Sequence, residues 1–291
     1  MSDEGRPVQI DDTALWVEER GQGFPLIVLH GGPGLDHHEF ADYLDPLTDR
    51  GIRLVLTDLR ACGRSEPCPP ATWTLERHAQ DVIMLARSLR LDRYAVLGHS
   101  YGAFVALQNA VDYPGMTARS IVSGGLASAR WLDRVEQNLL NFEPEALRAQ
   151  VAESWAREPD VRTREDFARL MHDQLPFHFR DPLDPRIEEY VERSGGTIYA
   201  PDVLRSFADA RYGGIEVEDR LKDVGSPLLV LAGRHDRTCV VEAAASMAEQ
   251  IPGARLEIFE DSGHMMFVEE QRRFLDLVAD FALEGSEAVS R

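Results

Sequence analysis

Residues 98–102 read Gly-His-Ser-Tyr-Gly, which places a serine between two glycines. The segment follows an apolar run at residues 94–97 and overlaps the start of an apolar, helix-like stretch at residues 101–111. A sharp turn from a strand into a helix exposes a serine hydroxyl, and glycines beside it let the two elements approach without a Cβ clash. We therefore predict that Ser100 is a catalytic nucleophile; the alternative is an ordinary serine in a glycine-rich turn.

A serine hydroxyl is too weakly acidic to attack an amide by itself, so it needs a histidine base and a carboxylate that orients this base. Two later strand-like runs are each followed by one of these residue types. Asp236 comes after the run at residues 227–232, and His264 comes after the run at residues 255–259. We expect both to join Ser100 at one end of a sheet; the alternatives are a helix N-cap for Asp236 and a solvated loop position for His264.

The other histidines are weaker candidates for the base. His99 and His235 are sequence neighbours of the expected triad residues, and we expect their side chains to point elsewhere. The remaining histidines lack a metal-binding spacing such as H-E-x-x-H, and the three cysteines lack the C-x-x-C spacing. We therefore expect neither a metal nor another cofactor.

Residues 30–34 read His-Gly-Gly-Pro-Gly and follow another apolar run at residues 25–29. An oxyanion hole needs backbone N–H groups aimed at the oxygen that becomes negative in the transition state. We assign these donors to the N–H groups of Gly32 and of Tyr101, the residue after the serine, with Gly31 as a competitor for the first role. The alternative interpretation of the glycine segment is a plain turn.

These candidate residues require a sheet whose strands end side by side. Apolar runs alternate with amphipathic helical stretches, a pattern typical of a mostly parallel sheet with helices on both faces. Two further strands are expected near residues 8–10 and 14–18, so we predict an α/β fold with about eight strands. The apolar runs are residues 25–30, 53–58, 94–98, 119–123, 227–232 and 255–259, and the expected helices include residues 75–89, 101–111 and 266–281.

The pattern changes between residues 126 and 220, where strand-like runs give way to charged helical stretches broken by prolines. Because this stretch lies between two expected parallel strands, we predict a helical cap over the carboxyl ends of the strands, where open α/β sheets bind ligands. The predicted organisation is a first core part at residues 1–125, the cap at residues 126–220, a second core part at residues 221–285 and a tail at residues 286–291.

The composition excludes several other classes. The chain has 291 residues, with 31 Lys and Arg against 50 Asp and Glu, a formal net charge of -19. This charge would repel nucleic acid and anionic membrane surfaces, so neither is an expected partner. No apolar run is long enough to span a membrane, and the polar, acidic N-terminus does not resemble a secretion signal. With three cysteines, too few for a disulfide framework, we expect a cytoplasmic protein.

Five motifs together carry a resemblance to a known family. They are His-Gly-Gly-Pro-Gly at residues 30–34, Asp-Leu-Arg-Ala-Cys-Gly-Arg-Ser at residues 58–65, Gly-His-Ser-Tyr-Gly at residues 98–102, Gly-Arg-His-Asp at residues 233–236 and Ser-Gly-His at residues 262–264. The set resembles the prolyl aminopeptidase (proline iminopeptidase) family of α/β-hydrolases, over roughly residues 20–125 and 222–282. The resemblance implies an α/β-hydrolase fold with Ser100, Asp236 and His264 as its triad.

The resemblance also implies a reaction. Members of this family release one N-terminal residue through an acyl-enzyme on the serine, and carboxylates of the cap hold the free α-amine of the substrate. The implied partner is a peptide or small-molecule amide with a free N-terminal amine, from which a small residue such as proline or alanine is removed. Asp209 lies where one glutamate of the family falls, so it is a candidate for holding the amine; the alternative is a solvated helix residue.

Two other classes of function stay open at this point. An esterase, lactonase or carbon–carbon bond hydrolase would use the same triad, because a fold does not determine a substrate. A non-catalytic ligand receptor would keep the fold and would bind its ligand equally well with Ser100 replaced by alanine. Only the aminopeptidase requires a free α-amine, so substrates with free and acetylated amines separate it from the other hydrolases.

Overall fold

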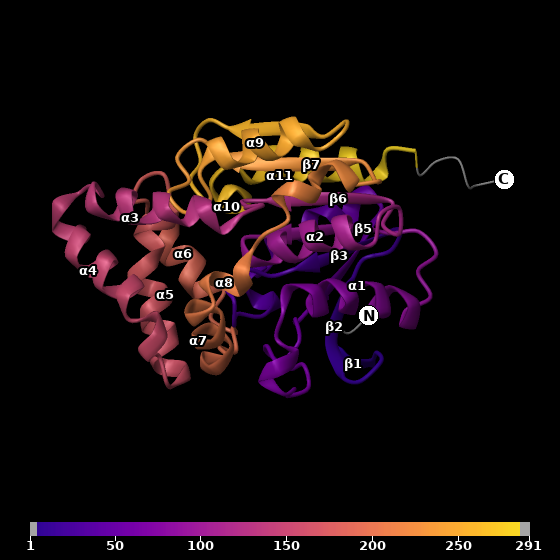
Figure 1. Cartoon of the computed structure of the whole chain (residues 1–291), viewed down its shortest axis with the longest axis horizontal. Helices are drawn as coiled ribbons and strands as arrows, with labels where there is room; N and C mark the ends of the chain where they lie inside the picture. The colour runs from indigo at the N-terminus through magenta and orange to yellow at the C-terminus, as the bar shows by residue number, and fades with distance from the viewer. Residues whose placement is uncertain (1–4, 286–291) are drawn as a thin grey trace.

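The computed structural model describes residues 5–285, which form one eight-stranded sheet with helices on both faces (Figure 1). The strands are β1 (Arg6–Gln9), β2 (Ala14–Arg20), β3 (Phe24–Leu29), β4 (Ile52–Thr57), β5 (Ala95–His99), β6 (Arg119–Ser123), β7 (Leu228–Gly233) and β8 (Arg255–Phe259). Their order in the sheet is β1-β2-β4-β3-β5-β6-β7-β8. The pairs β1–β2 and β2–β4 are antiparallel, and all other neighbours are parallel. The predicted α/β fold with a mostly parallel sheet of about eight strands is confirmed.

Two layers of helices cover the buried strands. These helices are α1 (Leu75–Ser88), α2 (Tyr101–Asp112), α9 (Val241–Gln250), α10 (Met266–Glu269) and α11 (Gln271–Leu283). In β3, Leu26 and Val28 pack in the same cluster as α11, whereas Ile27 and Leu29 pack with α1 and α2. This alternation follows from the strand itself, because successive side chains point to opposite faces of a sheet. Helix α9 packs with α2 over β6 and β7.

The end of the chain differs from the expected single helix over residues 266–281. Two helices, α10 and α11, meet there at Glu270, where the backbone leaves helical geometry with φ −125° and ψ 48°. The Glu270 carboxylate accepts hydrogen bonds from the N–H of Asp261 and the hydroxyl of Ser262. The break therefore lets this side chain bind the loop that carries His264.

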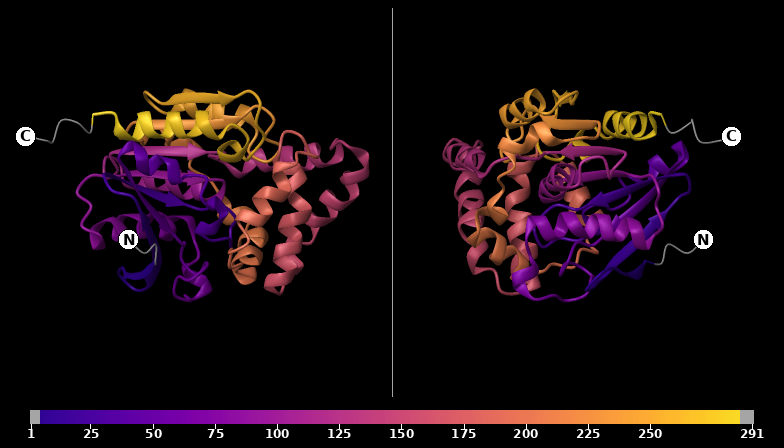
Figure 2. Two further views of the ribbon diagram at one scale, coloured as in Figure 1. Left: turned by 180° about the vertical axis from the view of Figure 1, so that it is seen from behind. Right: turned by 45° about the vertical axis from the view of Figure 1, so that its right-hand side comes forward.

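Between β6 and β7 the described chain is mostly helical, and its helices lie together at one end of the sheet (Figures 1 and 2). They are α3 (Asp133–Leu140), α4 (Glu145–Ala156), α5 (Arg164–His178), α6 (Arg186–Arg193), α7 (Pro201–Asp209) and α8 (Arg211–Gly214), with a short 3-10 helix η5 (Glu158–Asp160) between α4 and α5. Because the chain leaves β6 at its carboxyl end, this cap lies over the ends of the parallel strands. The cap boundaries at residues 126 and 220 stay a prediction, and the predicted tail at residues 286–291 lies outside the described residues.

No helix within residues 5–285 combines the length and the apolar character needed to cross a membrane.

Candidate active site

Ser100 lies on the turn between β5 and α2. Its backbone has φ 54° and ψ −119°, a conformation that side-chain-bearing residues rarely adopt. Two glycines allow this turn: a Cβ on Gly98 would lie 2.0 Å from the carbonyl oxygen of Gly102, and a Cβ on Gly102 would lie 2.2 Å from that of Leu29. The N–H of Ser100 donates to the carbonyl of Ser123 in β6 at 2.9 Å. The serine is thus held at the carboxyl end of β5, facing the cap.

Asp236 and His264, which follow β7 and β8, meet in a buried hydrogen bond of 2.6 Å between Oδ2 of Asp236 and Nδ1 of His264. The other carboxylate oxygen of Asp236 accepts from the N–H and hydroxyl of Thr238 and from the N–H of Cys239. Burial raises the pKa of Asp236. The charge of His264 and the hydrogen bonds from His264, Thr238 and Cys239 outweigh burial and leave this pKa below its usual value. Burial lowers the pKa of His264, but Asp236 raises it above its usual value. The pair is therefore arranged as a carboxylate that orients an imidazole.

The structure does not fit the alternative interpretations of Asp236 as a helix N-cap and of His264 as a solvated loop residue. His264 is 4% exposed, so it is not a solvated loop histidine. Helix α9 begins at Val241 after an N-cap at Val240, so Asp236 is not its N-cap. His99 is buried against His264 with ring centroids 4.8 Å apart, and His235 is exposed. Of His99, His235 and His264, it is His264 that lines the same cavity as Ser100.

Gly124, just after β6, makes room for this pair, and the sequence analysis did not single it out. Its φ is 58°, and a Cβ there would lie 2.9 Å from Cε1 and 3.0 Å from Nδ1 of His264. The same atom would lie 3.5 Å from Oδ2 of Asp236. A glycine directly after a buried strand was the available signal, because such a position often marks the close approach of another group.

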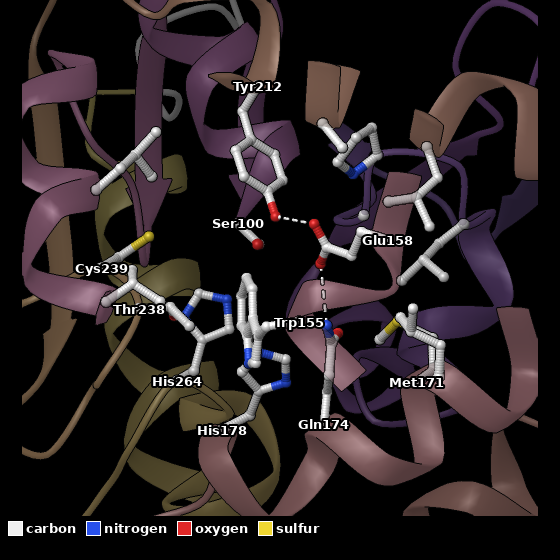
Figure 3. Close-up of a pocket in the computed structure, with 18 of the residues that line it drawn as sticks. Ser100, Trp155, Glu158, Met171, Gln174, His178, Tyr212, Thr238, Cys239 and His264 are labelled. Carbon is white, nitrogen blue, oxygen red and sulfur yellow. Dashed lines mark hydrogen bonds between the residues drawn. The ribbon is translucent and has the colours of Figure 1, made fainter. Parts of the chain in front are cut away.

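A cavity of about 700 Å³ separates the strand ends from the cap, and Ser100 and His264 both line it (Figure 3). Its other walls include the glycine turn after β3 and residues of cap helices α3, α4, α5, α7 and α8. Many of these lining side chains are apolar, among them Leu132, Val135, Leu139, Phe167 and Met171. A volume of this size is typical of small-molecule sites.

The glycine turn after β3 offers two backbone N–H groups for an oxyanion hole. The N–H of Gly31 donates to Oε2 of Glu39 at 2.5 Å, so it is directed toward this carboxylate. Gly32, with φ 111°, lines the cavity together with Ser100. Tyr101 is the first residue of α2, where N–H groups have no acceptor within the helix. The geometry favours Gly32 over its competitor Gly31, and Gly32 with Tyr101 remains our proposal for the hole.

Glu39 is a second buried acid at the cavity that the sequence analysis missed. Burial raises the pKa of Glu39 to about 7, although the hydrogen bond from Gly31 and the charge of His264 both lower it. A Cβ on Gly31 would lie 2.6 Å from Oε1 of Glu39 and 3.1 Å from Cβ of Ser100. Only a glycine therefore fits between these two side chains, and Glu39 fixes the direction of the turn.

The structure corrects our candidate for binding the substrate amine. Asp209 is exposed at the end of α7 and is not among the residues that line the cavity. Glu158 in η5 is buried and does line it, with its carboxylate accepting from the hydroxyl of Tyr212 at 2.6 Å and from Nε2 of Gln174 at 2.9 Å (Figure 3). Burial raises the pKa of Glu158, although both hydrogen bonds lower it. The motifs gave no signal for Glu158, because its burial depends on how the cap helices pack.

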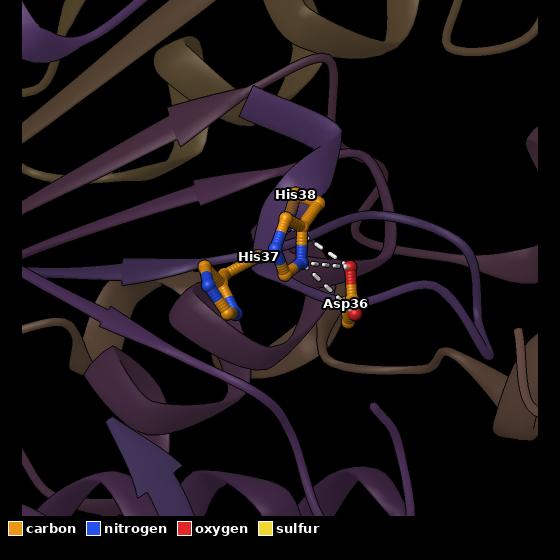
Figure 4. A group of neighbouring side chains, drawn as sticks. All are labelled: Asp36, His37 and His38. Carbon is orange, nitrogen blue, oxygen red and sulfur yellow. Dashed lines mark hydrogen bonds and ion pairs between the residues drawn. The ribbon is translucent and has the colours of Figure 1, made fainter. Parts of the chain in front are cut away.

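Asp36, His37 and His38 hold the segment after the glycine turn in place through hydrogen bonds and ion pairs; Figure 4 shows the three side chains. Asp36 accepts from the N–H of His38 and from that of Ile198 in the cap, each at 3.0 Å. The His37 ring contacts Asp58 at 2.5 Å through Nδ1, and its Nε2 contacts Glu18 of β2. Side-chain N and O atoms of Asp36, His37 and His38 lie within 4.8 Å of one another, close enough to hold a metal ion. The Asp36 carboxylate and both His37 ring nitrogens already take part in the contacts given above. The group therefore links the glycine turn to the sheet and to the cap.

Comparison with known sequences supports the predicted resemblance. Proline iminopeptidase of Lactobacillus delbrueckii subsp. bulgaricus is 29% identical over 275 residues, which cover 89% of this chain and 90% of that protein. Proline iminopeptidase of Clostridium botulinum is 28% identical over 272 residues, with 89% of each chain covered. The resemblance to proline iminopeptidases is confirmed and extends through the cap as well as the core.

Similar solved structures share the fold. Proline iminopeptidase of Mycobacterium smegmatis superimposes with a TM-score of 0.76 at 23% identity, covering 99% of this chain and 100% of that one. An esterase from Exiguobacterium antarcticum gives a TM-score of 0.75, also at 23% identity, with 96% and 99% covered. The model of the alpha/beta hydrolase fold family matches residues 25–271, so the chain belongs to this family.

Proposed function

We propose that the protein is a serine aminopeptidase that removes a small N-terminal residue, such as proline or alanine, from a peptide or a related amide. The observation that carries the proposal is a buried carboxylate, Glu158, in the same cavity as Ser100 and His264. The similarity to proline iminopeptidases over most of the chain supports it. The substrate would place its scissile carbonyl at Ser100 and its free amine toward Glu158.

In this mechanism His264 takes the proton of Ser100 as its hydroxyl attacks the carbonyl carbon. The N–H groups of Gly32 and Tyr101 stabilise the negative oxygen of the tetrahedral intermediate. His264 then gives the proton to the leaving amine, and an acyl-enzyme remains on Ser100. Water, activated by His264 in the same way, releases the amino acid, while Asp236 keeps the imidazole oriented and stabilises its charged form.

Glu158 suits the role of amine anchor for an electrostatic reason. An α-amino group has an ordinary pKa of about 7.7–8.0 and is mostly protonated at neutral pH. Burial raises the pKa of Glu158, and the two side chains that hydrogen-bond to it, Tyr212 and Gln174, are uncharged, so neither supplies a positive charge. A bound ammonium group would supply that charge, and charge-assisted hydrogen bonds of this kind are stronger than neutral ones. The anchor would restrict cleavage to the first residue of a chain.

The test compares alanyl and prolyl p-nitroanilides with their N-acetylated forms. We expect cleavage of the free amines only, and Glu158→Gln should lower kcat/KM for them by about 10- to 100-fold, as for the loss of a hydrogen bond to a charged group. Asp160→Asn is the matched control, since Asp160 is an exposed carboxylate of the same short helix. Equal cleavage of free and acetylated substrates would contradict the proposal.

An esterase, lactonase or carbon–carbon bond hydrolase is the second candidate, favoured by the apolar side chains that α3 and α5 contribute to the cavity. Such an enzyme would use the same three residues without Glu158. It would prefer simple aryl esters to aminoacyl anilides, and Glu158→Gln would leave its rate unchanged. Under either activity we propose a cytoplasmic location, which the three free cysteines support.

A further inference from the structure

The carboxyl end of cap helix α5 lies directly against the loop that carries His264. The N–H of His264 donates to the carbonyl of His178, the last residue of α5, at 2.6 Å. The carboxylate of Glu269 accepts from the N–H of Gly263 at 2.8 Å and from the N–H of Arg180 at 2.7 Å. Hydrogen bonds on both sides of the α5 end thus hold the backbone around the imidazole.

Arg237, the residue after Asp236, binds the same helix end. Its guanidinium donates to the carbonyls of Phe177, Phe179 and Arg180, at 3.2, 2.6 and 3.0 Å. Carbonyl groups at a helix carboxyl end have no partner within the helix and carry partial negative charge, so they suit a cation. Burial lowers the pKa of Arg237, but a guanidinium stays charged at any ordinary pH. One side chain therefore joins the loop of Asp236 to the helix end that holds His264.

The rings packed on His264 extend this contact. His178 lies against it with ring centroids 5.2 Å apart and also lines the cavity. His99 lies against it with centroids 4.8 Å apart. Burial lowers the pKa of His178 to about 3 and that of His99 well below its usual value, so both neighbours stay uncharged. The imidazole of His264 is thus flanked by two rings that carry no competing charge.

Helix α5 reaches the proposed amine anchor as well. Gln174, one turn before His178 on this helix, donates to Glu158 at 2.9 Å. Figure 3 shows the side chains of Gln174 and Glu158 at the cavity. The position of α5 therefore affects both the proposed anchor and the proposed base.

We propose that Arg237 is a positioning residue that holds the carboxyl end of α5 in place and thereby keeps His264 aligned with Asp236 and Ser100. The proposal rests on the serine hydrolase mechanism proposed above. Arg237 touches no reacting atom, and its effect runs through the backbone of residues 177–180. A planar guanidinium with several donors can bind three carbonyls at once, which a lysine ammonium on a flexible stem does less well.

The test measures how fast a fluorophosphonate labels Ser100 in the intact protein, because this probe carries no amine and reacts without the proposed anchor. Arg237→Met should lower the labelling rate constant and kcat together by about 10- to 100-fold, the range expected when reacting groups shift by about 1 Å. KM should change much less than kcat, because Tyr212, which is not on α5, also holds the proposed anchor Glu158. Arg237→Lys should recover part of the loss. Arg234→Met is the control, since Arg234 is exposed on the same loop and pairs with Glu260.

Rates are expressed per active site, counted by mass spectrometry of labelled protein, so a variant that merely folds poorly loses sites and keeps its rate constant. A wild-type rate constant per site in Arg237→Met overturns the proposal. If that variant does not fold, Arg237→Lys decides: a reduced rate supports the proposal and a wild-type rate overturns it. An unlabelled wild-type protein would instead overturn the serine hydrolase mechanism, so the two failures are distinct.

Discussion

The two halves of the site are built in different ways. On the core side, Gly32, Ser100, Asp236 and His264 follow β3, β5, β7 and β8, which are parallel and close together in the sheet. Their positions follow from strand register and from turns that only glycines allow. On the cap side, the proposed anchor Glu158 and its partners Gln174 and Tyr212 are side chains of separate helices, joined by hydrogen bonds.

This difference assigns different tasks to the halves. Parallel strands end at one edge, so the core can hold reacting groups rigidly whatever substrate is bound. The cap helices pack on one another through an apolar cluster of their own that includes Val135, Val151 and Phe177. They can therefore change with little effect on the sheet, which suits the choice of substrate. We therefore expect changes in the core half to remove the chemistry, and changes in the cap half, away from the carboxyl end of α5, to alter which substrates are used.

The largest effect is expected from Ser100→Ala. Removing the nucleophile of a serine hydrolase lowers kcat by about four orders of magnitude or more. The turn geometry should survive, because alanine has the same Cβ, so circular dichroism and the unfolding midpoint should match the wild type. Mass spectrometry after fluorophosphonate treatment should show no added mass. Full activity in this variant would show that Ser100 is not the nucleophile and that the core half does not carry out the chemistry.

Gly124→Ala should have the next largest effect, because the new Cβ would lie 2.9 Å from the His264 ring. We expect kcat to fall by about 100-fold, as for a small displacement of a catalytic group. Gly253→Ala is the matched control, since Gly253 also has positive φ, 72°, but has nothing within 4 Å of a Cβ. Both variants share the backbone strain, so only the contact with His264 differs. Equal kcat values in the two would contradict the assigned role of Gly124.

Tyr212→Phe tests the cap half and should be milder. It removes one of the two side-chain hydrogen bonds to Glu158 and should raise KM for aminoacyl anilides by about 3- to 10-fold, with kcat nearly unchanged. The fluorophosphonate labelling rate should stay at its wild-type value. Asp209→Asn is the comparison from the exposed end of α7, where we expect no change in KM. A larger change in KM for Asp209→Asn than for Tyr212→Phe would show that Asp209, and not Glu158, binds the substrate amine.

The same division explains what the sequence could reveal. Ser100, Asp236 and His264 each follow an apolar run, so a sheet of parallel strands was enough to predict that they lie near one another. The sharp turn at Ser100 also had a local signal in its flanking glycines. Core positions of this kind depend on short segments and on the rule that successive strand ends align.

Cap positions depend on packing between helices far apart in the chain, and here the structure favours Glu158 over the predicted Asp209. Asp209 and Glu158 are both acids at helix ends, and only the packing of α4, α5 and α8 buries one and exposes the other. Glu39 was missed because its contact with Gly31 needs the folded segment between them. The break at Glu270 was missed because the apolar residues on its two sides, at 267–268 and 274–275, are seven residues apart, a spacing that fits one continuous helix.

The last prediction concerns the stability of the core half. The ion pairs of His37 should affect the free energy of unfolding and should have the smallest effect on catalysis. His37 is 1% exposed between Asp58 and Glu18. Burial lowers the pKa of His37, but these two carboxylates raise it to about 9, above the usual 6.5. The folded state therefore binds the proton more tightly than the unfolded chain. This contribution is complete below about pH 6.5 and is lost as the pH rises through about 9, at most about 3 kcal/mol.

The free energy of unfolding in urea should accordingly fall between pH 7 and 9, and His37→Gln should flatten this slope. The buried acids Glu39 and Glu269, whose pKa values burial raises to about 7, act in the same direction but at lower pH. Each binds its proton more tightly in the folded state, so their stabilisation is lost mainly between about pH 4.5 and 7. His172→Gln is the control, since His172 is half exposed on α5. An unchanged slope in His37→Gln would show that the glycine turn does not depend on this ion pair, and the rigidity of the core half would then rest on strand register and glycines alone.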